Sequence, residues 1–290
     1  MARQSIGWIG VGKMGGPMSR RLIEAGYRVL VLDRDSHNRA LAASAGAEIV
    51  ADLSAMAAEA DVVFSMIPDD AVLREIVSQP GGLTASMARG GALVDMSTVS
   101  PPASEAVATL LAAVGIDYLR APVSGSTSMA EAGTLTVMAS GPRALFDRIE
   151  PMLTVISAKR FYLGDAEQAR YLKLVVNTLV GATSSILAEA LALGRKGGLS
   201  LDAMLDVICQ SAAASPLIGY KRDMLVSGNY QPAFTVEQMI KDFDLIMDTA
   251  RNDHVPMLLS AIVRQQYEQS LVSGNGQKDF FVLCEGIAEQ

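Results

Sequence analysis

The sequence predicts an α/β protein: a doubly wound parallel sheet followed by a smaller all-α domain that a long helix joins to it. Three observations support this prediction. A glycine turn separates an apolar strand from a helix near the N-terminus, short apolar runs alternate with helical patterns to about residue 163, and the chain from Glu167 onward is almost entirely helical. Alternating strand and helix patterns are typical of doubly wound parallel sheets.

The first element is a strand, turn and helix whose turn, residues 10–15, reads GVGKMG. Pro17 suits the first turn of a helix, and Gly26 can end that helix. In a dinucleotide site the first glycine allows the tight turn, the second lets the backbone approach the pyrophosphate, and the third allows close helix–strand packing. An ordinary glycine-rich turn is the alternative. The predicted cofactor contacts here are Gly10, Gly12, Lys13, Met14 and Gly15.

The next strand, Val29–Asp33, ends in an acid that lies 23 residues after Gly10 (33 − 10). This spacing is close to the usual distance of about 20 residues for an acid that binds the adenosine ribose. Asp33 should repel a 2′-phosphate and favour NAD, whereas Arg34 beside it could turn toward that phosphate and admit NADP. We therefore expect NAD or NADP as the cofactor, with NAD favoured.

Three further strands are predicted at Asp61–Ile67, Ala92–Asp95 and Asp117–Arg120. Ligands of doubly wound sheets bind beyond the carboxyl ends of the strands, so the residues that follow each strand are candidates. The alternative is that Pro68 starts a helix and that the hydroxyls of Ser97, Thr98 and Ser100 are helix caps. The predicted cofactor contacts here are Met66, Ile67, Pro68 and Thr98.

Apolar runs at Thr134–Met138 and Arg160–Leu163 flank a helical pattern at Arg143–Leu153, and we expect them to extend the sheet. We predict a dinucleotide-binding domain over residues 1–165 and a helical substrate and oligomerisation domain over 166–290. The second domain begins with a helix of about 30 residues that stops at Gly197-Gly198. Further helices are expected at Leu201–Ser211, Phe234–Asn252, Pro256–Ser270 and near Asp279–Ile287.

Two clusters could bind a substrate. The turn Ser124-Gly125-Ser126 offers amides and hydroxyls that could hold a carboxylate, or it is a flexible loop with capping serines.

Lys173 and Asn177 are four residues apart on the long helix and share an otherwise apolar face. They could be a snorkelling lysine and a satisfied buried amide. The functional reading is a proton-exchanging lysine, helped by partial burial, and an amide that orients the substrate.

Composition limits the classes of partner. The net charge of −7 opposes nucleic-acid and anionic-lipid binding. Cys209 and Cys284 are too few for a disulfide framework and lack zinc-site spacing, so we expect no metal and a cytoplasmic location. No signal peptide is expected before the first strand. Polar residues within the long apolar helix favour a buried helix over a membrane span, and its length favours a homodimer or homotetramer.

Together these segments resemble the β-hydroxyacid dehydrogenase family, whose members include 3-hydroxyisobutyrate dehydrogenases and tartronate semialdehyde reductases and are relatives of 6-phosphogluconate dehydrogenase. The resemblance runs essentially end to end. Five ordered segments carry it: residues 7–18, 121–126, 132–135, Lys173 with Asn177, and Lys241-Asp242.

The resemblance implies a Rossmann domain, a helical second domain, and a cleft between them for nicotinamide and a small β-hydroxyacid or semialdehyde. It implies that Lys173 is the catalytic lysine, that Asn177 orients the substrate and that Ser124, Gly125 and Ser126 bind its carboxylate. It also puts Lys241 near the cofactor, although a helix-surface charge pair such as Lys241-Asp242 is usually solvated.

The chain departs from the family in the segment before the lysine. The family usually has a glycine-rich turn there and paired asparagines after the lysine, where this chain has residues 167–169 (EQA) and Val176-Asn177. Ser126 likewise replaces a second glycine. Two alternative functions follow: an imine reductase of a non-acid substrate, which commonly has another residue at the lysine position, and a non-catalytic dinucleotide-binding module.

Overall fold

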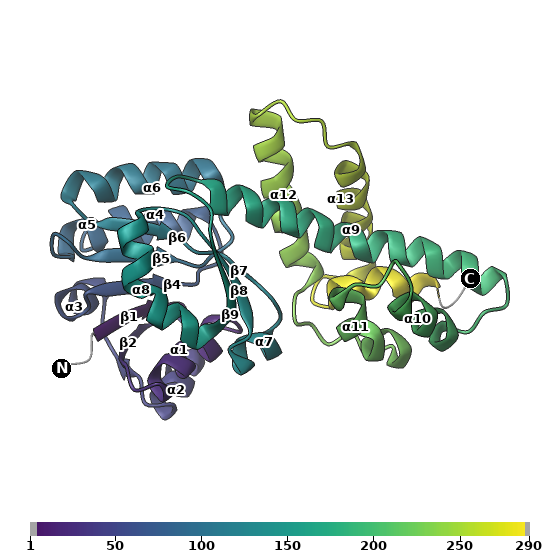
Figure 1. Ribbon diagram of the computed structural model, residues 1–290, viewed down its shortest axis with the longest axis horizontal. Coiled ribbons are helices and arrows are strands. Elements are labelled where there is room, and N and C mark those ends of the chain that lie inside the picture. Colours follow the sequence, from purple (N-terminus) through teal and green to yellow (C-terminus); the bar gives the residue numbers. More distant parts are fainter. Residues whose placement is uncertain (1–4, 288–290) are drawn as a thin grey trace. The chain divides into compact units, whose positions relative to one another are not determined.

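The computed structural model describes residues 5–287, and its contacts divide the chain into two units, Met1–Lys173 and Leu174–Gln290. The first unit, coloured purple to teal in Figure 1, contains both sheets, and the second is helical. The α/β class with a helical second part is therefore confirmed.

The main sheet has six parallel strands in the order β3-β2-β1-β4-β5-β6. Two halves extend in opposite directions from β1 and β4, which is the doubly wound topology that the sequence predicts. The strands are β1 (Ser5–Ile9), β2 (Arg28–Leu32), β3 (Glu48–Ile49), β4 (Val62–Ser65), β5 (Ala92–Asp95) and β6 (Asp117–Arg120).

Helices cover both faces of this sheet, as Figure 1 shows. Successive side chains of a strand point to opposite faces, so Ile6 and Trp8 of β1 join one buried cluster and Ile9 joins another. The first cluster lies under α1 and α8, and the second under α3, α4 and α6. The helices of this unit are α1 (Gly15–Glu24), α2 (Ser36–Ser44), α3 (Leu53–Glu59), α4 (Asp70–Ser78), α5 (Leu83–Ser86), α6 (Pro101–Val114), α7 (Thr127–Ala132) and α8 (Arg143–Ile156).

The expectation that the later apolar runs extend the main sheet is wrong. They form a three-stranded sheet of their own, β7 (Val123–Ser124), β8 (Leu135–Ala139) and β9 (Ser157–Tyr162), which meets the main sheet at an antiparallel bridge between Arg120 of β6 and Ser140. β7 pairs with β8 in antiparallel orientation, and β8 pairs with β9 in parallel. Pro122 lies between β6 and β7 and has no N–H to donate, and its carbonyl accepts from Met138 N of β8 at 3.0 Å.

The second unit is built around α9 (Gln168–Lys196), which starts in the first unit and is 29 residues long, as the sequence predicts. Its core packs residues of α9 against α12 and the C-terminal helical turns, with Phe243 and Tyr267 fully buried. The other elements are α10 (Leu201–Gln210), α11 (Pro216–Ser227), α12 (Val236–Asn252), α13 (Leu258–Ser270), η1 (Leu271–Asn275) and η2 (Phe280–Ile287). The sequence reasoning missed α11, whose apolar residues do not gather into one clear stripe.

Within residues 5–287, α9 alone is long and apolar enough to cross a membrane, a property that the core helices of soluble proteins share. Arg170, Lys173 and Asn177 lie in its first half and hydrogen-bond to protein groups.

Candidate active site

The glycine turn after β1 has room only for glycine at two positions. Gly10 has a φ of 86°, and a Cβ there would lie 2.3 Å from the Met66 carbonyl oxygen. A Cβ at Gly15 would lie 2.0 Å from the carbonyl oxygen of Gly10. The two glycines therefore allow the turn and the close packing of α1 on the sheet.

Gly12 has a different environment, because a Cβ there would meet only Asn38 Nδ2, at 4.0 Å. The backbone at Gly12 is thus open to a ligand. α1 begins beside it with no side-chain cap at Met14 and no acid in its first turn, so its amides can face an anion. Lys13 is an exposed cation in the same turn. The turn fits a pyrophosphate.

Asp33 follows β2 and lies against this turn. Its carboxylate accepts hydrogen bonds from Val11 N at 2.7 Å and Asp35 N at 2.8 Å. Arg34 forms an ion pair with Glu75, and both side chains are exposed. Exposed pairs of this kind contribute about 0–1 kcal/mol, so the pair does not fix Arg34 in place.

The loops after β4 and β5 are tied together. Ile67 N donates to Ser97 Oγ at 2.8 Å, and Ser97 is fully buried. The loops thus bring Met66, Ile67 and Pro68 near the segment that carries Thr98. The capping alternative is correct for Ser100, which accepts from Ala103 N at the start of α6, but Ser97 bonds to strand-end groups instead.

The predicted carboxylate loop starts in β7 with Ser124. Gly125 follows with a φ of 141°, which favours glycine. Ser126 is the N-cap of α7: its Oγ accepts from Met129 N at 3.3 Å and lies 2.7 Å from Ser128 Oγ. The structure therefore gives the loop a capping serine, with two hydroxyls side by side.

Lys173 lies beside this loop. Its Nζ donates to the carbonyl oxygen of Val123 at 2.9 Å, one residue before Ser124. Two segments 50 residues apart in sequence are thus in contact within the first unit. The amine and the loop can act on one small molecule.

Asn177 follows Lys173 by four residues on α9 and is 6% exposed. Its Nδ2 donates to Asp242 Oδ2, and Lys241 Nζ lies 3.1 Å from Asp242 Oδ1. Because a carboxylate only accepts hydrogen bonds, Asp242 fixes which end of the Asn177 amide faces it.

The expectation of a solvated Lys241-Asp242 pair is wrong for Asp242, which is 1% exposed. The sequence reasoning missed this residue. Asp242 lies three residues after Met239 and four before Ile246, on the buried face of α12. An acid on an apolar helix stripe is the signal that would have identified it.

Arg170 was also missed. Its side chain is 1% exposed and forms an ion pair with Asp95, which is fully buried. Burial alone would lower the pKa of Arg170, but Tyr118 and Asp95 outweigh it and the pKa is raised, so the guanidinium stays charged. For the Tyr118 phenol the effect of burial is the opposite: burial raises its pKa, and the phenol stays protonated.

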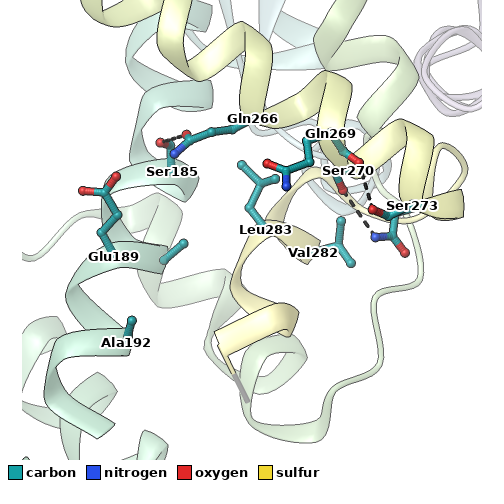
Figure 2. A pocket seen from close by; sticks show the side chains of 11 residues that line it. Ser185, Glu189, Ala192, Gln266, Gln269, Ser270, Ser273, Val282 and Leu283 are labelled. Carbon is teal, nitrogen blue, oxygen red and sulfur yellow. Dashed lines mark hydrogen bonds between the residues drawn. The ribbon is translucent and has the colours of Figure 1, made fainter. Parts of the chain in front are cut away.

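A cavity of about 530 Å³ lies in the helical unit. Figure 2 shows its lining side chains, which come from α9, α13 and the C-terminal turns. Its polar lining residues partly satisfy one another, as with Ser185 and Gln266. None of the residues that the sequence predicts for the site lines this cavity. The cavity is therefore distinct from the predicted site.

Two family models match the chain: the NAD binding domain of 6-phosphogluconate dehydrogenase over residues 5–164, and the NAD-binding domain of NADP-dependent 3-hydroxyisobutyrate dehydrogenase over residues 168–285. The chain is 35% identical to 2-(hydroxymethyl)glutarate dehydrogenase from Eubacterium barkeri over 97% of its own length and 93% of that protein.

Solved structures agree with these matches. 3-Hydroxyisobutyrate dehydrogenase from Mycobacterium tuberculosis, solved with L-serine, has a TM-score of 0.89 and 26% identity, covering 98% of this chain and 99% of that one. Psf3 in complex with NADP+ and 2-OPP has a TM-score of 0.88 and 25% identity, covering 97% and 99%.

The fold, the glycine turn and these matches define an NAD(P)-dependent oxidoreductase that acts on a CH–OH group. The chain belongs to the β-hydroxyacid dehydrogenase family.

Proposed function

We propose that Lys173 exchanges the proton of the substrate hydroxyl and that the substrate is a small β-hydroxyacid or its semialdehyde. The observation that carries this proposal is the 2.9 Å hydrogen bond from Lys173 Nζ to Val123 O, directly before the loop of Ser124, Gly125 and Ser126. When bound, the nicotinamide accepts a hydride from the carbinol carbon or returns it.

Lys173 acts as the general base when the hydroxyl is oxidised and as the general acid when the carbonyl is reduced. The hydrogen bond to Val123 O holds the amine at the edge of the carboxylate loop. If the loop binds the carboxylate of a substrate, a hydroxyl of the same substrate that is only a few bonds from the carboxylate can reach the amine. A β-hydroxyacid has its two groups at this spacing.

Asn177 and Asp242 orient the substrate oxygen. One Nδ2 hydrogen of Asn177 is committed to Asp242, and the amide keeps a second N–H and its oxygen for a ligand. Ser124, Gly125 and Ser126 supply backbone amides and hydroxyls for the carboxylate. Lys241, paired with Asp242, supplies a cation toward the cofactor.

We propose NAD as the preferred cofactor. The Asp33 carboxylate adjoins Val11 N in the glycine turn, where it would accept from ribose hydroxyls and repel a 2′-phosphate. Arg34 is the residue that would favour NADP, and its partner in the structure is Glu75.

Replacement of Lys173 by alanine tests the proposal. We expect turnover to be lost while the dinucleotide still binds, because the Lys173 amine contacts Val123, whereas the pyrophosphate would bind at the glycine turn, residues 10–15. Lys196→Ala, an exposed lysine in the last turn of the same helix, is the matched control and should retain full activity. Wild-type turnover by the Lys173→Ala variant would refute the role of the amine.

We also propose that the chain forms a homodimer or homotetramer. Large apolar side chains are exposed on α9 and α13 of the helical unit, where a second copy could cover them: Leu179, Ile186, Leu193, Leu258 and Leu259. Light scattering should give a mass at least twice that of one chain, and Leu258→Asp with Leu259→Asp should lower it. A monomeric wild type would contradict this proposal.

A further inference from the structure

The first turn of α9 is held by the side chain of Arg170. Its guanidinium donates to the last residue of β5, to the loop after β5, to a tyrosine of β6 and to a serine of α6, all in the first unit. The acceptors are the Asp95 carboxylate, Tyr118 OH at 2.7 Å, Ser97 O at 2.8 Å and Ser104 Oγ at 3.1 Å. A planar guanidinium with this many partners has one orientation.

The network continues from Asp95 into both loops that the sequence predicts for the cofactor. Asp95 Oδ1 accepts from Ser65 Oγ at 2.6 Å and from Ser97 Oγ at 2.7 Å. Ser97 Oγ in turn accepts from Ile67 N at 2.8 Å. The loops after β4 and β5 and the first turn of α9 are therefore joined by one chain of buried hydrogen bonds.

A second group of contacts holds the residues just before this turn. Glu167 forms an ion pair with Arg120 of β6, and both side chains are largely buried. Ser140 Oγ donates to Ala166 O at 2.6 Å and accepts from Ala169 N at 3.1 Å. The segment that the family resemblance would make a glycine-rich turn is thus fixed by side chains in this protein.

We propose that Arg170 is a positioning residue that fixes the Lys173 amine relative to the loops after β4 and β5. Lys173 follows Arg170 by three residues, so it lies on the same turn and face of α9. The inference rests on the proposed role of Lys173.

A purely stabilising role explains the network less well. Well-packed apolar side chains are often as stable as a buried ion pair, so such a pair is weak evidence for stability alone. Here the ion pair adjoins both the loops after β4 and β5 and the helical turn of Lys173: Asp95 accepts from Ser65 and Ser97, and Ser97 Oγ accepts from Ile67 N. A misplacement of a catalytic group by about 1 Å can lower the rate on the order of 100-fold, so a network that fixes the Lys173 amine would support catalysis.

The test removes both charges together, because a single loss would leave an unpaired buried charge. The variant is Arg170→Met with Asp95→Asn. Its matched control is Lys221→Met with Asp279→Asn, which removes another buried ion pair, 3% and 0% exposed, in the helical unit. Arg170→Lys is the conservative variant, which keeps the charge and loses the fork of donors.

Three readouts are combined. The first is kcat with a hydroxyacid, corrected for the folded fraction, with its isotope effect for deuterium at the carbinol carbon. The second is the dinucleotide Kd from the fluorescence of Trp8, whose indole N–H donates to Gly10 O at 3.0 Å. The third, which needs no activity, is amide hydrogen exchange of residues 168–173.

We expect the Arg170/Asp95 variant to lose about 100-fold in kcat, to show a larger isotope effect, and to exchange faster at residues 168–173. Its dinucleotide Kd should change much less than its kcat, since the glycine turn that would hold the pyrophosphate is untouched even though Asp95 contacts the loops after β4 and β5. The kcat of Arg170→Lys should lie between that of the wild type and that of the Arg170/Asp95 variant. The Lys221/Asp279 control should lose thermal stability with no change in kcat or isotope effect.

Wild-type kcat and isotope effect in the Arg170/Asp95 variant would overturn the inference, as would unchanged exchange at residues 168–173. If the wild type itself has no turnover with any hydroxyacid, the proposed function fails. The exchange measurement then decides by itself whether Arg170 fixes the turn that carries Lys173.

Discussion

Gly12→Ala separates a ligand-binding role of the glycine turn from a structural one. A Cβ at Gly12 meets only Asn38 Nδ2 at 4.0 Å, so the fold has room for the methyl group. Replacing a glycine by alanine where the backbone allows it raises the free energy of unfolding by about 0.4–1 kcal/mol, because the unfolded chain becomes less flexible. We expect Gly12→Ala to be at least as stable as the wild type.

The same methyl group should weaken dinucleotide binding. It occupies the space through which the backbone approaches the pyrophosphate. We expect the Kd to rise at least about 10-fold, equivalent to about 1.4 kcal/mol. Gly15→Ala should instead destabilise the protein, since its Cβ would lie 2.0 Å from Gly10 O.

Trp8 provides the assay, because it is the single tryptophan and hydrogen-bonds to Gly10. Its fluorescence during NAD titration gives the Kd, and thermal unfolding gives the stability. The control is Gly219→Ala on α11, where a Cβ meets nothing within 4 Å; it should gain stability and bind NAD normally. Wild-type affinity in Gly12→Ala would refute the assignment of the open face to the pyrophosphate.

Three further predictions follow. Asp33→Asn should raise kcat/KM with NADP relative to NAD, because the charge that repels a 2′-phosphate is removed; an unchanged ratio would disprove this role. Thr235→Ala removes the acceptor of the Gln238 N–H at 3.1 Å in the capping box of α12 and should lower the free energy of unfolding by about 1 kcal/mol in urea titrations. An unaltered midpoint and slope would contradict it. Burial raises the pKa of Cys284 to about 12, so its thiol stays protonated at mildly alkaline pH; a thiol reagent should label Cys209 and spare Cys284 until unfolding. Equal labelling of both in the native protein would count against this.

Sequence reasoning succeeds where the physical constraint is local. The glycines at residues 10–15 predict the turn directly, because Gly10 has a positive φ and Gly15 lies too close to the Gly10 carbonyl for a side chain. The length of α9 follows from its apolar spacing and the glycines after Lys196. The parallel sheet follows from the alternation of strand and helix.

Features that depend on distant partners were missed or misread. Asp242 looks like a surface charge until Asn177, 65 residues earlier, is found to donate to it. Arg170 contacts Asp95 across 75 residues, and no spacing rule connects them. Likewise, β8 pairs with β7 and β9 and not within the main sheet, and an apolar pattern does not reveal which strands pair.

The most direct test of the central claim is a screen of purified protein against hydroxyacids, semialdehydes and cyclic imines with both dinucleotides, followed by the absorbance of reduced nicotinamide. We predict turnover with a small β-hydroxyacid or its semialdehyde, faster with NAD than with NADP and absent in Lys173→Ala. Turnover with cyclic imines alone would instead indicate an imine reductase. Dinucleotide binding, detected by Trp8 fluorescence, without turnover of any substrate would indicate a non-catalytic module. Either result would contradict the account.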